Sequence, residues 1–238
     1  MNGKPKTSPW VYVGIGCTAV VVLIVAGVAS VSFFGYRWAK RMEADMKDPA
    51  ARESRVKQVL GCQSLPDGYH PMVSVSIPFV MEMAMLSDRD PDDEGRIHGF
   101  EKRGFLYFQF LNMGSNEQEL RDYFEGKTQD DSVLRRHHIN VHMRSREQIK
   151  RGVIDMEDHR VMYLAQRGHL DMAEGRAEGV SSLLLIDCPQ DSRRRMAIWF
   201  GPDPDSKAPV AKADFSGTPA DEAAIRGFLG HFQLCHKS

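Results

Sequence analysis

The stretch Gly104–Leu111 (GFLYFQFL) decides the fold class of this 238-residue chain. It is short, aromatic and almost continuously apolar, which is typical of a strand in the middle of a sheet. The alternation of apolar and small polar residues at Met72–Ile77 (MVSVSI) predicts another strand, and the looser alternation at Val80–Leu86 (VMEMAML) predicts a third. The first half of the folded region therefore contains a group of neighbouring strands.

A second group of strands is expected in the C-terminal half. The segments Gly152–Met156, Arg160–Gln166, Val180–Cys188 and Arg193–Phe200 are predicted as strands, and Ile139–Met143 is a shorter candidate. Because the turns within each group are short and polar, we expect antiparallel meanders.

Helices are expected before and between the two groups of strands. Asp48-Pro49 is typical of an N-cap followed by proline at the first helical position, and Gly61 is typical of the residue that ends a helix. Ser115-x-x-Gln118 is a capping box for a second helix. Asp131–Arg136 and a segment capped by Ser145-x-x-Gln148, which stops near Gly152, are candidates for brief helices.

The last helix has the strongest signal. Thr218-Pro219 is a capped start, and apolar side chains then recur at i, i+3, i+4 and i+7 at Ile225, Phe228, Leu229 and Phe232. The predicted fold class is therefore α+β, with one antiparallel β-sheet and helices packed on it. This order of elements resembles PsbP-like domains, which implies a sheet that carries helices and a chain that ends in an amphipathic helix.

A long uncharged segment lies near the N-terminus. Thr7–Tyr36 contains no charged residue, whereas about 20 apolar residues suffice to cross a bilayer. A cleaved signal peptide would have a shorter apolar region, and a lipoprotein would use Cys17, although the apolar sequence continues well beyond it. We therefore expect an uncleaved transmembrane helix over residues 10–36, preceded by a tail of residues 1–9.

The rest of the chain divides into a charged juxtamembrane linker, residues 37–47, and an α+β soluble domain, residues 48–238. The excess of Lys and Arg just after the span favours the cytoplasm for this domain. Single N-terminal anchors in bacteria mostly export the domain attached to them, which favours the periplasm. Both sides of the cell membrane stay open for this single-pass protein.

The anchor segment KTSPWVYVGIGC (residues 6–17) and the segment TPADEAAIRGFLGHFQLC (residues 218–235) are similar to those of uncharacterised bacterial single-pass membrane proteins. This resemblance implies a membrane location and no particular activity.

The charge balance argues against a nucleic-acid partner. The whole chain carries a formal net charge of −1, and residues 1–41 contain five bases and no acid, so residues 42–238 carry −6. An acidic domain repels phosphates. The expected partners are the lipid bilayer, through residues 10–36, and a protein.

The sequence contains no motif of a known catalytic or cofactor site, so no catalytic residue, cofactor or metal is assigned. The spacings of His137, His138 and His142, and of His159 and His169, fit no zinc pattern. The segment Asp88-x-Asp90-x-Asp92 begins like a calcium loop, but it lacks the later glycine and glutamate, which favours a solvated acidic loop.

Three cysteines lie beyond the span. A Cys–His nucleophile can be drawn from any of them with His231 or His236, as in many chains that contain both residue types. In an oxidising compartment, a disulfide is the expected use of two of them. Cys188 ends a predicted strand and Cys235 ends the helix that should cover the sheet, so these two are the preferred pair.

Arg193 and Arg195 are a candidate anion contact, because alternate residues of a strand share a face and the guanidinium group suits planar anions. A solvated strand edge is the alternative.

The predicted function is a membrane-tethered, non-enzymatic binding or assembly module of unknown ligand. The alternative is a membrane-anchored enzyme with an unrecognised site. Titratable groups with perturbed pKa values that converge on a pocket would favour the enzyme, whereas a flat apolar patch would favour partner binding.

Overall fold

The computed structural model describes residues 37, 40, 44, 45, 47–77, 80–91, 99–111, 117–137, 143–172, 175–189, 191 and 193–235. The chain divides into two units, Met1–Asp45 and Met46–Ser238, and the second unit contains the sheet. Among the described residues, no helix is long and apolar enough to cross a membrane. The predicted span over residues 10–36 lies outside them.

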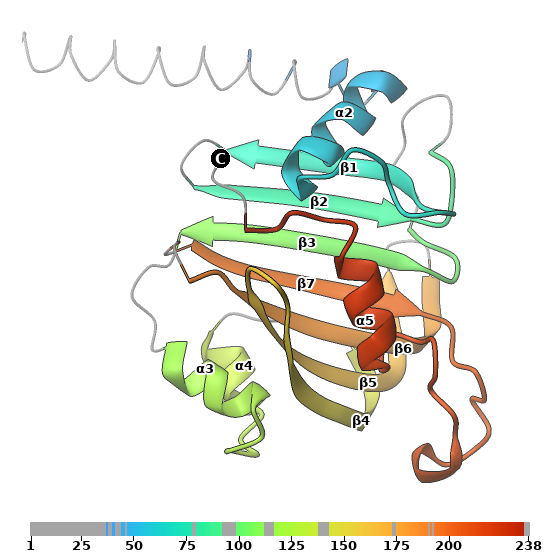
Figure 1. The fold of residues 1–238 in the computed structure, drawn as a ribbon. Helices are drawn as coiled ribbons and strands as arrows, with labels where there is room; N and C mark the ends of the chain where they lie inside the picture. The colour runs from blue at the N-terminus through green and yellow to red at the C-terminus, as the bar shows by residue number, and fades with distance from the viewer. Residues whose placement is uncertain are drawn as a thin grey trace, which may run out of the picture. The chain divides into compact units, whose positions relative to one another are not determined.

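A seven-stranded antiparallel sheet forms the centre of the second unit, in the order β1-β2-β3-β7-β6-β5-β4 (Figure 1). Strands β1–β3 form one meander and β4–β7 another, and the two meet where β3 pairs with β7. The predicted α+β class, with an antiparallel sheet and packed helices, is confirmed. The strands are β1 (His70–Ile77), β2 (Met81–Ser87), β3 (Gly104–Leu111), β4 (Met143–Asp155), β5 (Arg160–Met172), β6 (Gly175–Asp187) and β7 (Arg193–Gly201).

The described helices begin and end largely where local signals place them. In α2 (Pro49–Leu60), the Asp48 side chain accepts hydrogen bonds from the backbone N–H groups of Ala50 and Ala51, and Gly61 ends the helix with a φ of 63°. The helices are α2 (Pro49–Leu60), α3 (Glu117–Phe124), α4 (Ser132–Arg136), the 3₁₀-helix η1 (Val210–Lys212) and α5 (Glu222–Leu229).

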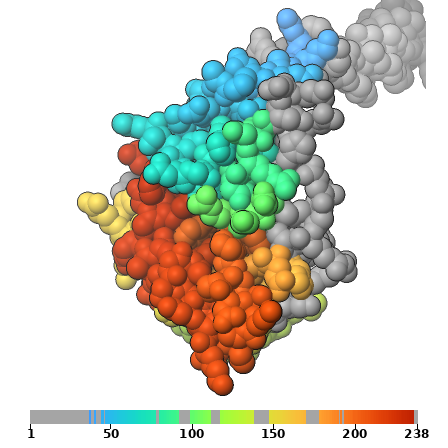
Figure 2. All heavy atoms as spheres, turned by 90° about the vertical axis from the view of Figure 1, so that its right-hand side faces the viewer, coloured from blue at the N-terminus to red at the C-terminus, as the bar shows by residue number. Residues whose placement is uncertain are grey.

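Helices α2 and α5 cover one face of the sheet, which we call the α2/α5 face (Figure 1). Phe228 of α5 lies at the centre of its core, with its ring centroid 4.4 Å from that of Trp199 and 5.1 Å from that of Phe105. The indole N–H of Trp199 donates to the hydroxyl of Tyr69, 2.9 Å away. Aromatic residues from both ends of the unit therefore share one core, and Figure 2 shows the N-terminal and C-terminal segments of the unit packed directly against each other.

Helices α3 and α4 pack on part of the opposite face, the α3/α4 face, over the strands of the second meander. Across β1, β2 and β3 the same face is also apolar, because the strand register aligns Val75 with Met83 and Met83 with Phe108. These side chains are partly exposed. The apolar side chains of this part of the face are Val75, Ile77, Met81, Met83, Met85, Leu106, Phe108 and Phe110.

Three expectations differ from the structure. The helix predicted after Ser145 is wrong, because that segment belongs to strand β4, which pairs with β5 from Met143 to Asp155 with two register shifts. Backbone pairing with a neighbouring strand outweighs a local capping pattern. Strands β5 and β6 are longer than the predicted segments Arg160–Gln166 and Val180–Cys188, because they continue to pair with each other up to Met172 and Gly175. The last helix begins three residues later than expected, with Asp221 and not Thr218 as its N-cap.

Several short predictions fall on residues outside the described part of the chain. They include the capping serine of α3, Ser115, and residues 139–142 of the short strand expected at Ile139–Met143.

Candidate functional site

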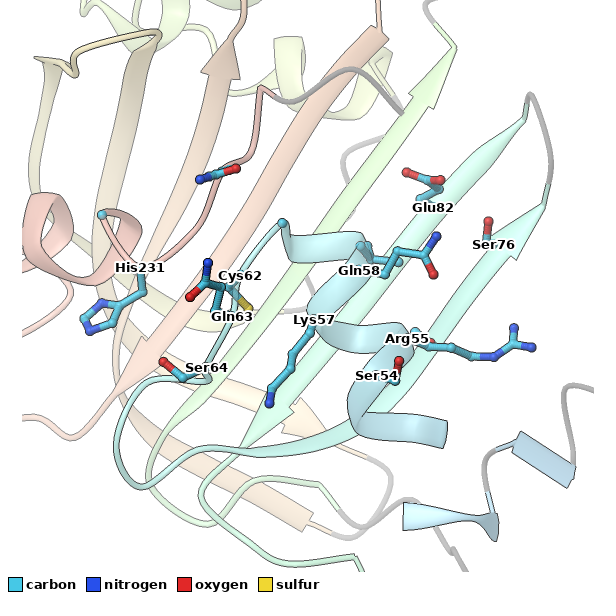
Figure 3. Close-up of a pocket in the computed structure, with 15 residues that line it drawn as sticks. Ser54, Arg55, Lys57, Gln58, Cys62, Gln63, Ser64, Ser76, Glu82 and His231 are labelled. Carbon is cyan, nitrogen blue, oxygen red and sulfur yellow. The ribbon is translucent and has the colours of Figure 1, made fainter. Parts of the chain in front are cut away.

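A groove of about 1230 Å³ lies on the α2/α5 face, and we call it the α2 groove (Figure 3). Three separate segments of the chain line it, namely α2 with the turn after it, the strands β1 and β2, and the segment after α5. Its side chains are mostly hydroxyls and amides. The lining residues are Ser54, Arg55, Lys57, Gln58, Val59, Gly61, Cys62, Gln63, Ser64, Ser74, Ser76, Glu82, Gly230, His231 and Gln233.

At one end of the groove, Arg55 and Gln58 extend from α2 on the side where Ser76 and Glu82 lie (Figure 3). The Glu82 carboxylate accepts a hydrogen bond of 3.0 Å from the Gln109 amide, and the Gln109 carbonyl oxygen accepts one of 3.1 Å from the Tyr107 hydroxyl. Glu82 is thereby fixed by a buried polar chain, because Gln109 and Tyr107 are both buried.

The other wall of the groove is held by the end of the described chain. The backbone N–H of Gln233 donates to the carbonyl oxygens of Leu60, the last residue of α2, and of Gly61, the residue that ends it, with N···O distances of 3.2 Å. Two residues later, Cys235 is joined to Cys188 by a disulfide, with their Cα atoms 5.6 Å apart. This Cα separation lies within the usual range for a disulfide. The C-terminal segment thus closes the carboxyl end of α2.

The structure brings Cys62 and His231 to the same groove, so the Cys–His arrangement can be judged from their surroundings. Burial raises the pKa of the Cys62 thiol, although the Lys57 charge and a backbone hydrogen bond act in the opposite direction. A raised pKa keeps the group protonated at neutral pH, whereas a nucleophile needs the thiolate. His231 directs its Nδ1 to the Gly227 carbonyl oxygen, 3.0 Å away. These surroundings favour the protonated form of the Cys62 thiol.

The predicted anion contact is occupied by a carboxylate of the chain itself. Arg193 and Arg195 share the α2/α5 face, and both contact Asp191, at 2.9 Å from Arg193 Nε and 2.5 Å from Arg195 Nη2. The Arg195 side chain is fully buried. Burial acts to raise the pKa of Asp191, but hydrogen bonds from Arg195 and from the Arg193 backbone N–H outweigh it and lower the pKa to about 2. The cluster is therefore an internal ion pair that ties β7 to the turn before it.

Acid should weaken this cluster. Because the pKa of Asp191 is lower in the folded protein than its ordinary value of 3.8, its contribution to stability is complete above about pH 4 and is lost as the pH falls towards 2. We expect Asp191→Asn to unfold at lower urea than the wild type at pH 7, and the difference to shrink between pH 4 and pH 2.5. Asp67→Asn, in an exposed turn, controls for the change in net charge. A difference that is constant with pH would contradict the assigned role.

The acidic loop is organised by hydrogen bonds to its own backbone. The Asp88 carboxylate accepts from the backbone N–H groups of Glu101, Lys102 and Arg103 at 2.8–3.0 Å. Asp90 lies 2.6 Å from Nδ1 of His70, and Asp92 lies outside the described residues. Within the described part of the chain, no three His, Cys, Asp or Glu residues are arranged to hold a metal ion.

Sequence reasoning did not single out the α2 groove. The serines of MVSVSI are a sequence feature that could have predicted its β1 wall, because Ser74 and Ser76 place hydroxyl groups on a face that is otherwise part of the core. No local sequence pattern predicts that the segment after α5 lines the groove, because this depends on tertiary contacts. No model of a known protein family matches this chain, and no curated protein is similar to it in sequence.

Proposed function

We propose that this chain is a membrane-tethered, non-enzymatic binding module, anchored by residues 10–36, and that the α2 groove holds its ligand. The observation that carries the proposal is the lining of the groove, where serine hydroxyls and glutamine amides from three segments surround a volume of about 1230 Å³. Such groups donate and accept hydrogen bonds without exchanging protons at neutral pH. They suit recognition of a polar ligand.

The groove is also held in a fixed shape, which favours affinity because less conformational entropy is lost on binding. The disulfide Cys188–Cys235 and the hydrogen bonds from Gln233 fix one wall. The chain of hydrogen bonds from Tyr107 through Gln109 fixes Glu82 on the floor. The proposed bilayer anchor would hold the module near ligands in or beside the membrane.

A site-specific crosslink tests this function. A photoreactive phenylalanine derivative in place of Gln58, which lines the groove, should form a discrete adduct on illumination of cells that make the full chain. The same substitution at Ser206, in the exposed loop after β7, should form none. Adducts at both positions, or at neither, would reject the groove as a binding site. Loss of the Gln58 adduct in a Cys62→Ser background would favour the enzyme alternative instead.

A further inference from the structure

The two edges of the sheet are built differently. The edge strand β4 contains two register shifts against β5 and carries the charged residues Glu147, Lys150 and Arg151. Bulges and charged side chains are the devices by which proteins block the addition of another strand to a sheet. The β4 edge is therefore protected.

Over most of its described length, the opposite edge strand, β1, has neither a bulge nor a charged side chain. Among the described strands, β2 alone pairs with it. Pro71 and the register shift between Pro71 and Val73 protect its first end, and a proline is tolerated there because the strand lies at an edge. From Val73 to Ile77 the register is regular and no side chain is charged. An edge of this kind presents a row of backbone donors and acceptors to an incoming strand.

The side chains of β1 supply a different surface on each side of that edge. On the α2/α5 face, Ser74 and Ser76 line the α2 groove together with Arg55 and Gln58. On the α3/α4 face, Val75 aligns with the partly exposed methionine Met83 of β2. A strand added next to β1 would place its successive side chains alternately in the groove and beside this apolar row, because side chains alternate along a strand.

We propose that the ligand of the α2 groove is an extended polypeptide segment of a protein partner, which adds as a further strand to the edge of β1 opposite β2. The segment carries apolar residues at every second position, on the methionine side, and small or polar residues between them, on the groove side. Backbone hydrogen bonds hold it, and the alternate side chains select it. This inference rests on the proposed binding function and names its class of ligand.

A synthetic peptide with the sequence of β2, MEMAMLS (residues 81–87), is a suitable probe, because this sequence already pairs with β1 in the fold with its methionines beside Val73, Val75 and Ile77. We expect a fluorescent form to bind the full chain in phospholipid nanodiscs, with saturable anisotropy above that of empty nanodiscs.

Two N-methylated isomers of the peptide separate strand addition from other modes of binding. Each isomer carries methyl groups on alternate backbone nitrogens, so one blocks the N–H groups that face β1 and the other blocks those that point away. The isomer whose methylated nitrogens face β1 should bind about tenfold more weakly than the other isomer, because it loses two or three hydrogen bonds to the edge. Ser76→Lys should weaken binding of the unmodified peptide, and Ser206→Lys, which adds the same charge on an exposed loop, should not.

Binding no stronger than to empty nanodiscs, equal binding of both isomers, or loss of binding by both would overturn strand addition. The wild-type chain serves in the isomer comparison, so the result does not depend on the folding of a variant. A groove-specific crosslink at Gln58 together with one of these negative results would retain the binding function and reject the polypeptide strand as its ligand.

Discussion

Replacing Val22 and Ile24 with arginine is expected to abolish the association of the chain with membranes. Both residues lie near the middle of the proposed span over residues 10–36. Each arginine at the centre of a span costs roughly 2.5–3.5 kcal/mol on insertion scales, so the pair costs about 5–7 kcal/mol. After an alkaline wash, the wild-type chain should pellet with membranes and the double variant should stay in the supernatant.

The matched control is the double variant Val22→Leu and Ile24→Leu, which keeps the segment apolar and should pellet like the wild type. If the double arginine variant also pellets fully after the wash, the segment is not the membrane anchor.

Loss of the disulfide should produce the largest change in the stability of the folded domain. The bond between Cys188 and Cys235 closes a sequence separation of 47 residues, which the chain-entropy model values at about 4 kcal/mol. Cys188→Ser with Cys235→Ser should therefore lower the free energy of unfolding of the oxidised protein by about that amount, as measured by urea denaturation. Dithiothreitol should lower the wild type to the level of the variant.

Thiol labelling in intact cells tests on which side of the membrane the proposed anchor would hold the domain. In an exported domain, Cys188 and Cys235 should react with a maleimide only after reduction. Cys62, the free cysteine among the described residues, is the internal control for reagent access after unfolding. Free thiols at Cys188 and Cys235 before reduction would reject the bond in the cell and support the cytoplasmic orientation that the charges after the span favour.

Local patterns predict those elements of this fold whose signals are local. The stretch Gly104–Leu111 forms a strand with those same bounds, and Asp48 and Gly61 begin and end α2 as their residue types indicate. The prediction of a helix after Ser145 fails because the segment pairs with β5 instead, and this pairing cannot be read from the neighbouring residues in the sequence. The predicted N-cap of the last helix, Thr218, is wrong because Thr218 and Asp221 are both good N-cap residues, and the path of the backbone decides between them.

The candidate site was less accessible to sequence reasoning. The alternation of side chains along a strand predicts that Arg193 and Arg195 share one face. It does not predict that both contact the carboxylate of Asp191, because the position of Asp191 depends on the turn before β7. The α2 groove combines residues near positions 60, 75 and 230, which are brought together only by the sheet order and by the contact of Gln233 with the end of α2. Neither relation has a signature in sequence spacing.

The pairing of β3 with β7 sets the order in which the domain can be completed during its synthesis. The first meander ends at Leu111, and the partner of its last strand begins at Arg193, roughly 80 residues later. At 5–20 residues per second, a ribosome needs roughly 4–16 s to make that length of chain. During this interval β3, which becomes a central strand, is an apolar outer strand of a three-stranded meander. The nascent chain therefore presents the unpaired edge of this strand to chaperones until β7 emerges and pairs with it.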